Sequence, residues 1–189
     1  MYFLFGVLGG LGAVWLFTQR FGFRAQTPND YGNGPTFDIR EVLNGPLACD
    51  GVIYGPTGRV TSRFVAEFEA EWEGDTGVMR EHFSYDSGTT QDREWRLSVG
   101  PEGTIIANAD DLVGTGHGCQ SGSGVQLNYA IKLPKSAGGH TLQVTDWMYL
   151  LENGTVINRS QFRKFGLKVG ELVATMRPNP SAAEAQEAA

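Results

Sequence analysis

The chain has 189 residues, enough for one domain with appendages. Its net charge of -6 argues against a nucleic-acid partner, because affinity for nucleic acid comes mainly from Lys and Arg that neutralise phosphates. The 26 glycines, the many aromatic residues and the lack of long helix-forming stretches favour an all-β domain with many tight turns.

The N-terminus is apolar, and Met1 to Phe17 carry no charged side chain. As a helix this run spans roughly 25 Å, close to the hydrocarbon thickness of a bilayer. A cleaved signal peptide is the alternative, but no basic residue precedes the run and no convincing cleavage site follows it. We therefore expect residues 1–19 to form a transmembrane anchor. Arg20 and Arg24 would place the main domain in the cytoplasm by the positive-inside rule, although two arginines are a small bias.

Residues 20–36 are expected to form a linker, because "AQTPNDYGNGPT" (25–36) is rich in Pro, Gly and Asn. Residues 178–189 have no apolar periodicity that could be buried and are expected to be a disordered tail. A single domain is predicted between them, over residues 37–177. Its only short helical candidate is "FDIREVLNG" (37–45), which ends at Gly-Pro.

The domain shows an alternation of period two. Between residues 63 and 72, aromatic and small apolar side chains alternate with a second set that includes three glutamates, which places the two sets on opposite faces of a strand. The same alternation recurs over 92–99 and 125–133, and Gly-, Pro- and Asn-rich turns separate the runs. We predict about nine to ten strands in an antiparallel, up-and-down β-barrel of the lipocalin or calycin type, since closure removes both sheet edges. A flat β-sandwich is the alternative.

The stretch "DLVGTGHGCQSGSGVQ" (111–126) resembles a nucleotide-binding loop at first sight. It lacks the Lys and the following helix of a phosphate-binding loop. His117 and Cys119 could share a metal with nearby aspartates, but the ligand spacing of a zinc site is absent and no metal is expected. Gly114 and Gly116 would lie on one face of a strand. Facing inwards they would help to make a cavity, and facing outwards they would only allow a bend.

The two cysteines, Cys49 and Cys119, are compatible with a disulfide in an oxidising compartment. Two free structural thiols are the alternative.

The hairpin over 145–166 is predicted to bring polar groups inside the barrel. Asp146 falls on the apolar face of its strand, where a carboxylate is costly unless it is paired. Arg159, across the turn, is the expected partner, and Asn158 can add hydrogen bonds. This pair either fixes the register of the hairpin or anchors the carboxylate or phosphate head group of a ligand. The candidate ligand-binding residues are Asp146, Arg159, Asn158, Tyr85, Tyr129, Trp147, Gly114 and Gly116.

Four blocks carry a resemblance to a known family: "FDIREVLNGPL" (37–47), "FSYDSGTTQDREW" (83–95), "ADDLVGTGHG" (109–118) and "DWMYLLENGTVINRSQFRKFGLKVGEL" (146–172). Together they resemble the bacterial domain-of-unknown-function family numbered 3833. The resemblance implies a periplasmic, membrane-tethered, lipocalin-like envelope protein whose genes often neighbour those of cyclopropane-fatty-acid-synthase-type enzymes. It implies no catalytic residue. Members are often lipoproteins, whereas this chain has no N-terminal cysteine to accept a lipid.

The leading hypothesis is a non-enzymatic barrel in the inner membrane, with its domain in the periplasm, that binds a lipid or fatty-acyl ligand. It would assist membrane lipid modification or the response to envelope stress, with a lipid-modifying enzyme as a candidate partner. No catalytic residue, cofactor or metal is assigned. One alternative is an enzyme acting on lipid, with Asp146, Arg159, Tyr85 or His82 at its site. Another is a scaffold that docks a membrane complex.

Overall fold

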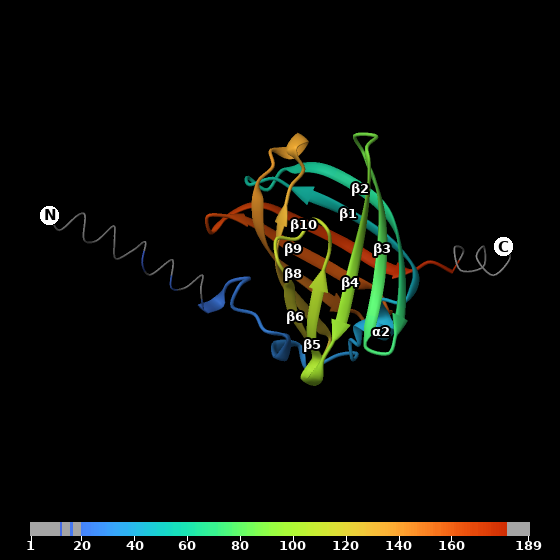
Figure 1. Ribbon diagram of the computed structural model, residues 1–189. Coiled ribbons are helices and arrows are strands. Elements are labelled where there is room, and N and C mark those ends of the chain that lie inside the picture. The colour runs from blue at the N-terminus through green and yellow to red at the C-terminus, as the bar shows by residue number, and fades with distance from the viewer. Residues whose placement is uncertain (1–11, 13–15, 17–19, 181–189) are drawn as a thin grey trace.

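The computed structural model describes residues 20–180, together with Gly12 and Leu16. Ten antiparallel strands form a closed barrel in which each strand pairs with its neighbours in the chain, and β1 pairs with β10 to complete the ring (Figure 1). The predicted up-and-down β-barrel is confirmed, and the sandwich alternative is wrong. The strands are β1 (Gly45–Tyr54), β2 (Val60–Glu73), β3 (Thr76–Tyr85), β4 (Thr90–Val99), β5 (Thr104–Asn108), β6 (Gly116–Ser121), β7 (Gly124–Lys132), β8 (Thr141–Leu150), β9 (Val156–Lys164) and β10 (Leu167–Pro178).

The alternation in the sequence sets which side chains enter the barrel. In β2, Phe64 and Phe68 are buried inside, whereas Glu67 between them is exposed. Removing such rings from water stabilises the fold by about 1.5–3 kcal/mol each. Buried apolar residues from β1 to β10 form one continuous core within the ring.

One end of the barrel is closed by a single helical turn. This turn, α2 (Ile39–Val42), lies in the predicted helical segment and begins at Asp38, whose side chain accepts a hydrogen bond from the backbone N–H of Arg40. Ile39 is fully buried, and the Trp72 indole donates a hydrogen bond of 2.7 Å to the carbonyl of Leu43. These contacts hold α2 across the barrel end. Short helical turns elsewhere in the barrel domain and the segment before it include η1 (Pro28–Tyr31), η2 (Pro101–Gly103) and η3 (Lys135–Ala137).

The segment before α2 packs on the outer wall of the barrel. The carbonyl of Tyr31 accepts a hydrogen bond from the backbone N–H of Ser123, and the Tyr31 ring meets the rings of Trp147 and Tyr149 edge-on at 5.5 and 5.0 Å. The Tyr149 hydroxyl donates to the side chain of Gln26. Trp147 therefore lies on the outside of the strand wall and is still fully buried.

The shortest pairings in the wall are those of β5, and β4 pairs with it only over Arg96–Val99. The loop 109–115 runs beside the other half of β4. Its backbone hydrogen-bonds to β7 instead: the Val113 N–H donates to the Ala130 carbonyl, and the Asp111 carbonyl accepts from the Lys132 N–H. Side chains close the seam between this loop and β4, and one of them is Arg93, which pairs with Asp111.

The predicted transmembrane anchor, residues 1–19, lies outside the described residues except for Gly12 and Leu16. Within the part that is described, none of the helices has the length and apolar character needed to cross a bilayer.

Candidate functional site

The barrel encloses a cavity of about 440 Å³. Ile39 and Leu43 line it at the end closed by α2, while Pro134 and Ala137 line it where the β7–β8 loop meets the rim. Most of its wall is apolar, with the rings of Phe64, Phe68, Phe83, Trp95 and Phe162 among the lining side chains. Its volume lies within the range of about 300–1,000 Å³ typical of small-molecule sites.

A belt of polar side chains crosses this apolar interior. We call it the polar belt, and it consists of Glu81, Arg93, Tyr129, Asp146, Asn158 and Ser160, all of which line the cavity.

Asp146 on β8 is the best-satisfied acid of the polar belt. It accepts hydrogen bonds from the Ser160 hydroxyl at 2.7 Å, from the Asn158 side-chain amide and, at 3.4 Å, from the Tyr129 hydroxyl. Burial raises the pKa of the Asp146 carboxyl, and the donors from Ser160 and Asn158 act against that shift. Three neutral donors thus hold a buried carboxylate without a direct cation.

Glu81 on β3 is the less satisfied acid. Its side chain is only 7% exposed, and its Oε2 has no hydrogen-bond partner among the described residues. The nearest cation is Arg93, whose Nη1 lies 4.0 Å from Oε2. Burial raises the pKa of Glu81 to about 7; Arg93 and a side-chain contact with Trp95 act against this shift, and Asp146 adds to it.

Arg93 on β4 is already engaged on several sides. Its Nε donates to Asp111 Oδ1 at 3.1 Å, and its Nη2 lies 3.1 Å from the same oxygen without hydrogen-bond geometry. Its guanidinium carbon stands 4.0 Å from the centre of the Trp95 ring, a cation–π contact. The cation is thus shared between Asp111 at the seam, Glu81 inside the barrel and an aromatic face.

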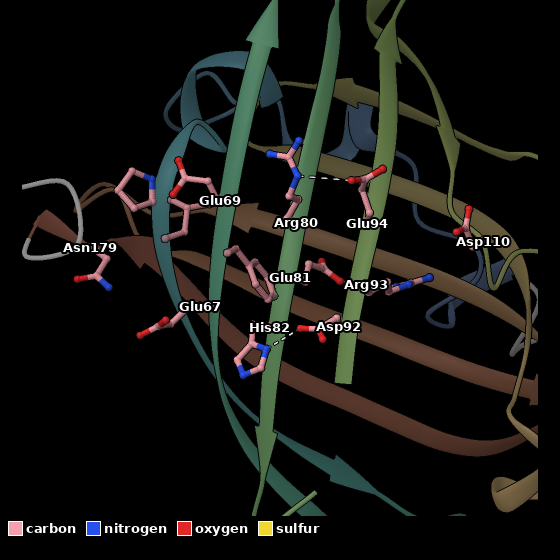
Figure 2. Close-up of a pocket in the computed structure, with 13 residues that line it drawn as sticks. Glu67, Glu69, Arg80, Glu81, His82, Asp92, Arg93, Glu94, Asp110 and Asn179 are labelled. Carbon is pink, nitrogen blue, oxygen red and sulfur yellow. Dashed lines mark hydrogen bonds and ion pairs between the residues drawn. The ribbon is translucent and has the colours of Figure 1, made fainter. Parts of the chain in front are cut away.

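The outer wall of β2–β4 carries a different set of charges, which Figure 2 shows beside the inward pair. Arg80 points to Glu94 and His82 points to Asp92 on the outside, whereas Glu81 lies towards the interior. This wall forms an open depression of about 630 Å³. Its ion pairs are exposed to solvent, and interactions between exposed charges contribute little free energy because water competes for the charged groups. The enclosed cavity is therefore the better candidate site.

Four of the predicted ligand-binding residues line the cavity: Asp146, Asn158, Tyr85 and Tyr129. The hydroxyl of Tyr85 donates to the side chain of Gln91 at 3.0 Å, near the rim. These residues come together because their strands place them all on the inner face.

The expected ion pair between Asp146 and Arg159 is wrong. In the register of β8 and β9, Asp146 lies opposite Ser160 and Trp147 lies opposite Arg159. Arg159 therefore points out of the barrel, where its Nε pairs with Glu171 at 2.5 Å. Trp147 also faces outwards, so neither residue reaches the cavity.

The glycines are placed differently from one another. Gly114 lies in the loop before β6 with φ of 80°, and a side chain there would meet open space. Gly116 is buried, and a Cβ on it would stand 3.2 Å from Tyr129 Cβ. A Cβ on Gly118 would stand 2.2 Å from the backbone oxygen of Gln126 and 2.4 Å from Leu127. The neighbouring strands thus fill the space beside Gly116 and Gly118, and these glycines add no room to the cavity.

The proposed disulfide is not formed. Cys49 and Cys119 are both free, on β1 and β6, which are far apart in the order of strands round the ring. Burial raises the pKa of the Cys49 thiol to about 12, so this thiol behaves as a small apolar core residue. Among residues 20–180, no group of three or more His, Cys, Asp or Glu side chains is placed to hold a metal ion.

Sequence reasoning missed Glu81, Arg93 and Ser160 as site residues. The signal was present, because Glu81 alternates with Met79 and Phe83 on the inner face of β3. Arg93 likewise shares its face with Trp95. Each of them occupies a position that alternates in step with the apolar residues of its strand, and the same pattern identified Asp146 as facing inwards.

An up-and-down barrel that encloses an apolar cavity crossed by polar groups belongs to the lipocalin-like class of barrels. The chain itself is a member of a family of proteins of unknown function, DUF3833, whose model matches residues 18–178. The resemblance seen in the sequence is confirmed. No curated protein matches the chain.

The solved structures that are similar to this chain include two with a TM-score above 0.5. Rv2717c from M. tuberculosis is 15% identical with a TM-score of 0.54, and the match covers 74% of this chain and 94% of that one. The S-type phycobiliprotein lyase CPES from Guillardia theta is 8% identical with a TM-score of 0.55, and the match covers 82% of this chain and 98% of that one. At these identities the likeness concerns the fold alone.

Proposed function

We propose that the barrel binds an amphiphile with a single apolar chain, such as a lipid or fatty-acyl compound, inside its cavity. The observation that carries the proposal is the cavity of about 440 Å³, apolar over most of its wall and crossed by the polar belt. An apolar chain would gain about 0.8 kcal/mol for each methylene that it buries. The polar belt would orient the other end of the molecule.

We further propose that residues 1–19 anchor the chain in the inner membrane, with the barrel in the periplasm. The uncharged N-terminal run supports the anchor, and the envelope location implied by the family resemblance supports the periplasmic placement. From there the barrel would take up lipid close to the bilayer and deliver it to, or hold it for, a lipid-modifying enzyme. The orientation is tested by fusing a reporter to the chain after Ala189, with one reporter that is active only in the periplasm and another that is active only in the cytoplasm. Activity in the cytoplasm alone would overturn the periplasmic placement.

Ligand binding is tested with a series of alcohols of increasing chain length. The full chain is delipidated and kept in digitonin, a detergent too bulky for the cavity, and each alcohol displaces a neutral fluorescent probe, dodecanol carrying a nitrobenzoxadiazole group. We expect affinity to rise up to about fourfold per methylene, as 0.8 kcal/mol implies, and to level off once the cavity is full. No probe binding, or a rise without a plateau, would overturn the proposal.

Two matched variants locate the binding. Ala174 lines the cavity, so Ala174→Phe should fill part of the space and weaken binding of the longest alcohols most. Ala130 lies outside the ring on β7, so Ala130→Phe should leave binding unchanged. Near-ultraviolet circular dichroism checks that both variants are folded. Equal binding by both folded variants would show that the alcohols bind elsewhere.

A further inference from the structure

The acidic groups that face the cavity outnumber the basic ones. Glu81 and Asp146 lie within the polar belt, and Asp111 faces the cavity from the seam beside β4. The facing cations are Arg93 and, at the end of β7, Lys132. The deep part of the cavity therefore holds more carboxylates than cations, whereas a site for anions would show the reverse.

The cation inside the barrel already has two acids beside it, although its Nη2 makes no hydrogen bond among the described residues. Arg93 is held by Asp111 at 3.1 Å, has Glu81 at 4.0 Å and stacks on Trp95. An entering carboxylate that reached Arg93 would meet both acids at close range. Like charges at such distances repel strongly in a buried site, because the effective dielectric constant there is low.

One acid of the polar belt has an acceptor atom without a donor among residues 20–180. Asp146 already accepts from three neutral groups, but Glu81 Oε2 is buried, lines the cavity and accepts no hydrogen bond within the described part of the chain. A buried acceptor without a partner costs about 1–3 kcal/mol, more when it is charged. A ligand that brings an N–H or O–H to this oxygen would remove that cost.

We propose that the cavity selects amphiphiles whose head group donates a hydrogen bond and carries no negative charge, an amine or a hydroxyl, and that it discriminates against fatty-acid carboxylates. The inference rests on the proposed function, since it assigns the head group of the ligand bound there. Glu81 accepts the hydrogen bond from the head group. Where the head group is an ammonium, it also pairs with the Glu81 carboxylate.

The test compares three probes of equal chain length: dodecylamine, dodecanol and dodecanoate. Each displaces the same neutral fluorescent probe from the full chain in digitonin at pH 8. We expect dodecylamine and dodecanol to displace it at concentrations at least tenfold lower than dodecanoate. A carboxylate that binds as tightly as the alcohol would overturn the inference and would place the head group on Arg93 instead.

Glu81→Gln provides the second arm, with Glu67→Gln as its matched control. Both variants lose one negative charge, but Glu67 is exposed on the outer face of β2. Glu81→Gln should lower the ratio of amine to alcohol affinity at least fivefold, and Glu67→Gln should leave it unchanged. Comparing each variant with the wild-type protein cancels the partitioning of each probe into micelles. An unchanged ratio in folded Glu81→Gln would overturn the role of Glu81.

The same assay separates this inference from the function on which it rests. If all three compounds bind but dodecanoate binds as tightly as dodecanol, only the head-group assignment is contradicted. Failure of the fluorescent probe to bind at all contradicts the proposed function, and the head-group assignment with it.

Discussion

Replacing the buried acid of β3 should change how stability depends on pH. Burial raises the pKa of Glu81 from its ordinary value of 4.5 to about 7, against the attraction of Arg93. The folded protein therefore keeps a proton that the unfolded chain loses. The contribution to the free energy of unfolding is fully present below pH 4.5 and is lost as pH rises through 7. At about 1.36 kcal/mol per pH unit, the loss amounts to about 3 kcal/mol.

Glu81→Gln removes this titration while keeping nearly the same shape. The variant should therefore be more stable than the wild-type protein at pH 8, and its advantage should shrink by about 2–3 kcal/mol at pH 5. Urea unfolding of the full chain in digitonin, followed by circular dichroism at several pH values, measures the difference. Glu67→Gln, which alters an exposed carboxylate, should show no such dependence.

The result that refutes the reasoning is a variant less stable than the wild-type protein at pH 8. It would mean that the attraction between Glu81 and Arg93, whose atoms lie 4.0 Å apart, outweighs the cost of burying the ionised acid. A difference that does not vary with pH would also refute it, since Glu81 would then keep its ordinary pKa.

Three further predictions concern residues outside the polar belt. Arg159→Ala should leave displacement of the fluorescent probe unchanged, because Arg159 pairs with Glu171 outside the barrel; weaker binding would contradict that placement. Gly118→Ala should lower the free energy of unfolding by about 1–3 kcal/mol, since its Cβ would stand 2.2 Å from the backbone oxygen of Gln126 and 2.4 Å from Leu127. Gly170→Ala, whose nearest contact is 3.4 Å, serves as the control and should cost less. Both cysteines should react with a thiol reagent in the unfolded, unreduced chain, and mass spectrometry would detect a bonded pair as unlabelled protein.

Much of the fold could be predicted because strand alternation is a local property. The pattern of Phe64 and Phe68 against Glu67 fixes which face of β2 is buried, without knowledge of the neighbouring strands. The same parity placed Asp146 inside the barrel correctly. Hairpin turns between successive strands then allow few topologies other than an up-and-down sheet, which closes on itself.

The partner of Asp146 could not be found in this way, because a partner depends on register. A shift of one residue between β8 and β9 exchanges Arg159 for Ser160 on the inner face. The turn between these strands had to be known in detail to choose between them. Trp147 shows the same limit: its parity places it outside, and only the N-terminal segment packed over it explains why it is buried.

The amino-acid sequence by itself determined the class of fold, the family and the inward direction of the acid on β8, because each depends on composition or on period-two patterning along one strand. The tertiary structure alone decided which groups share the interior. It brought Glu81 of β3, Arg93 of β4 and Asp146 of β8 round one cavity and separated the two cysteines. These outcomes depend on register and on ring closure, which join residues distant in the chain and leave no local pattern in the sequence.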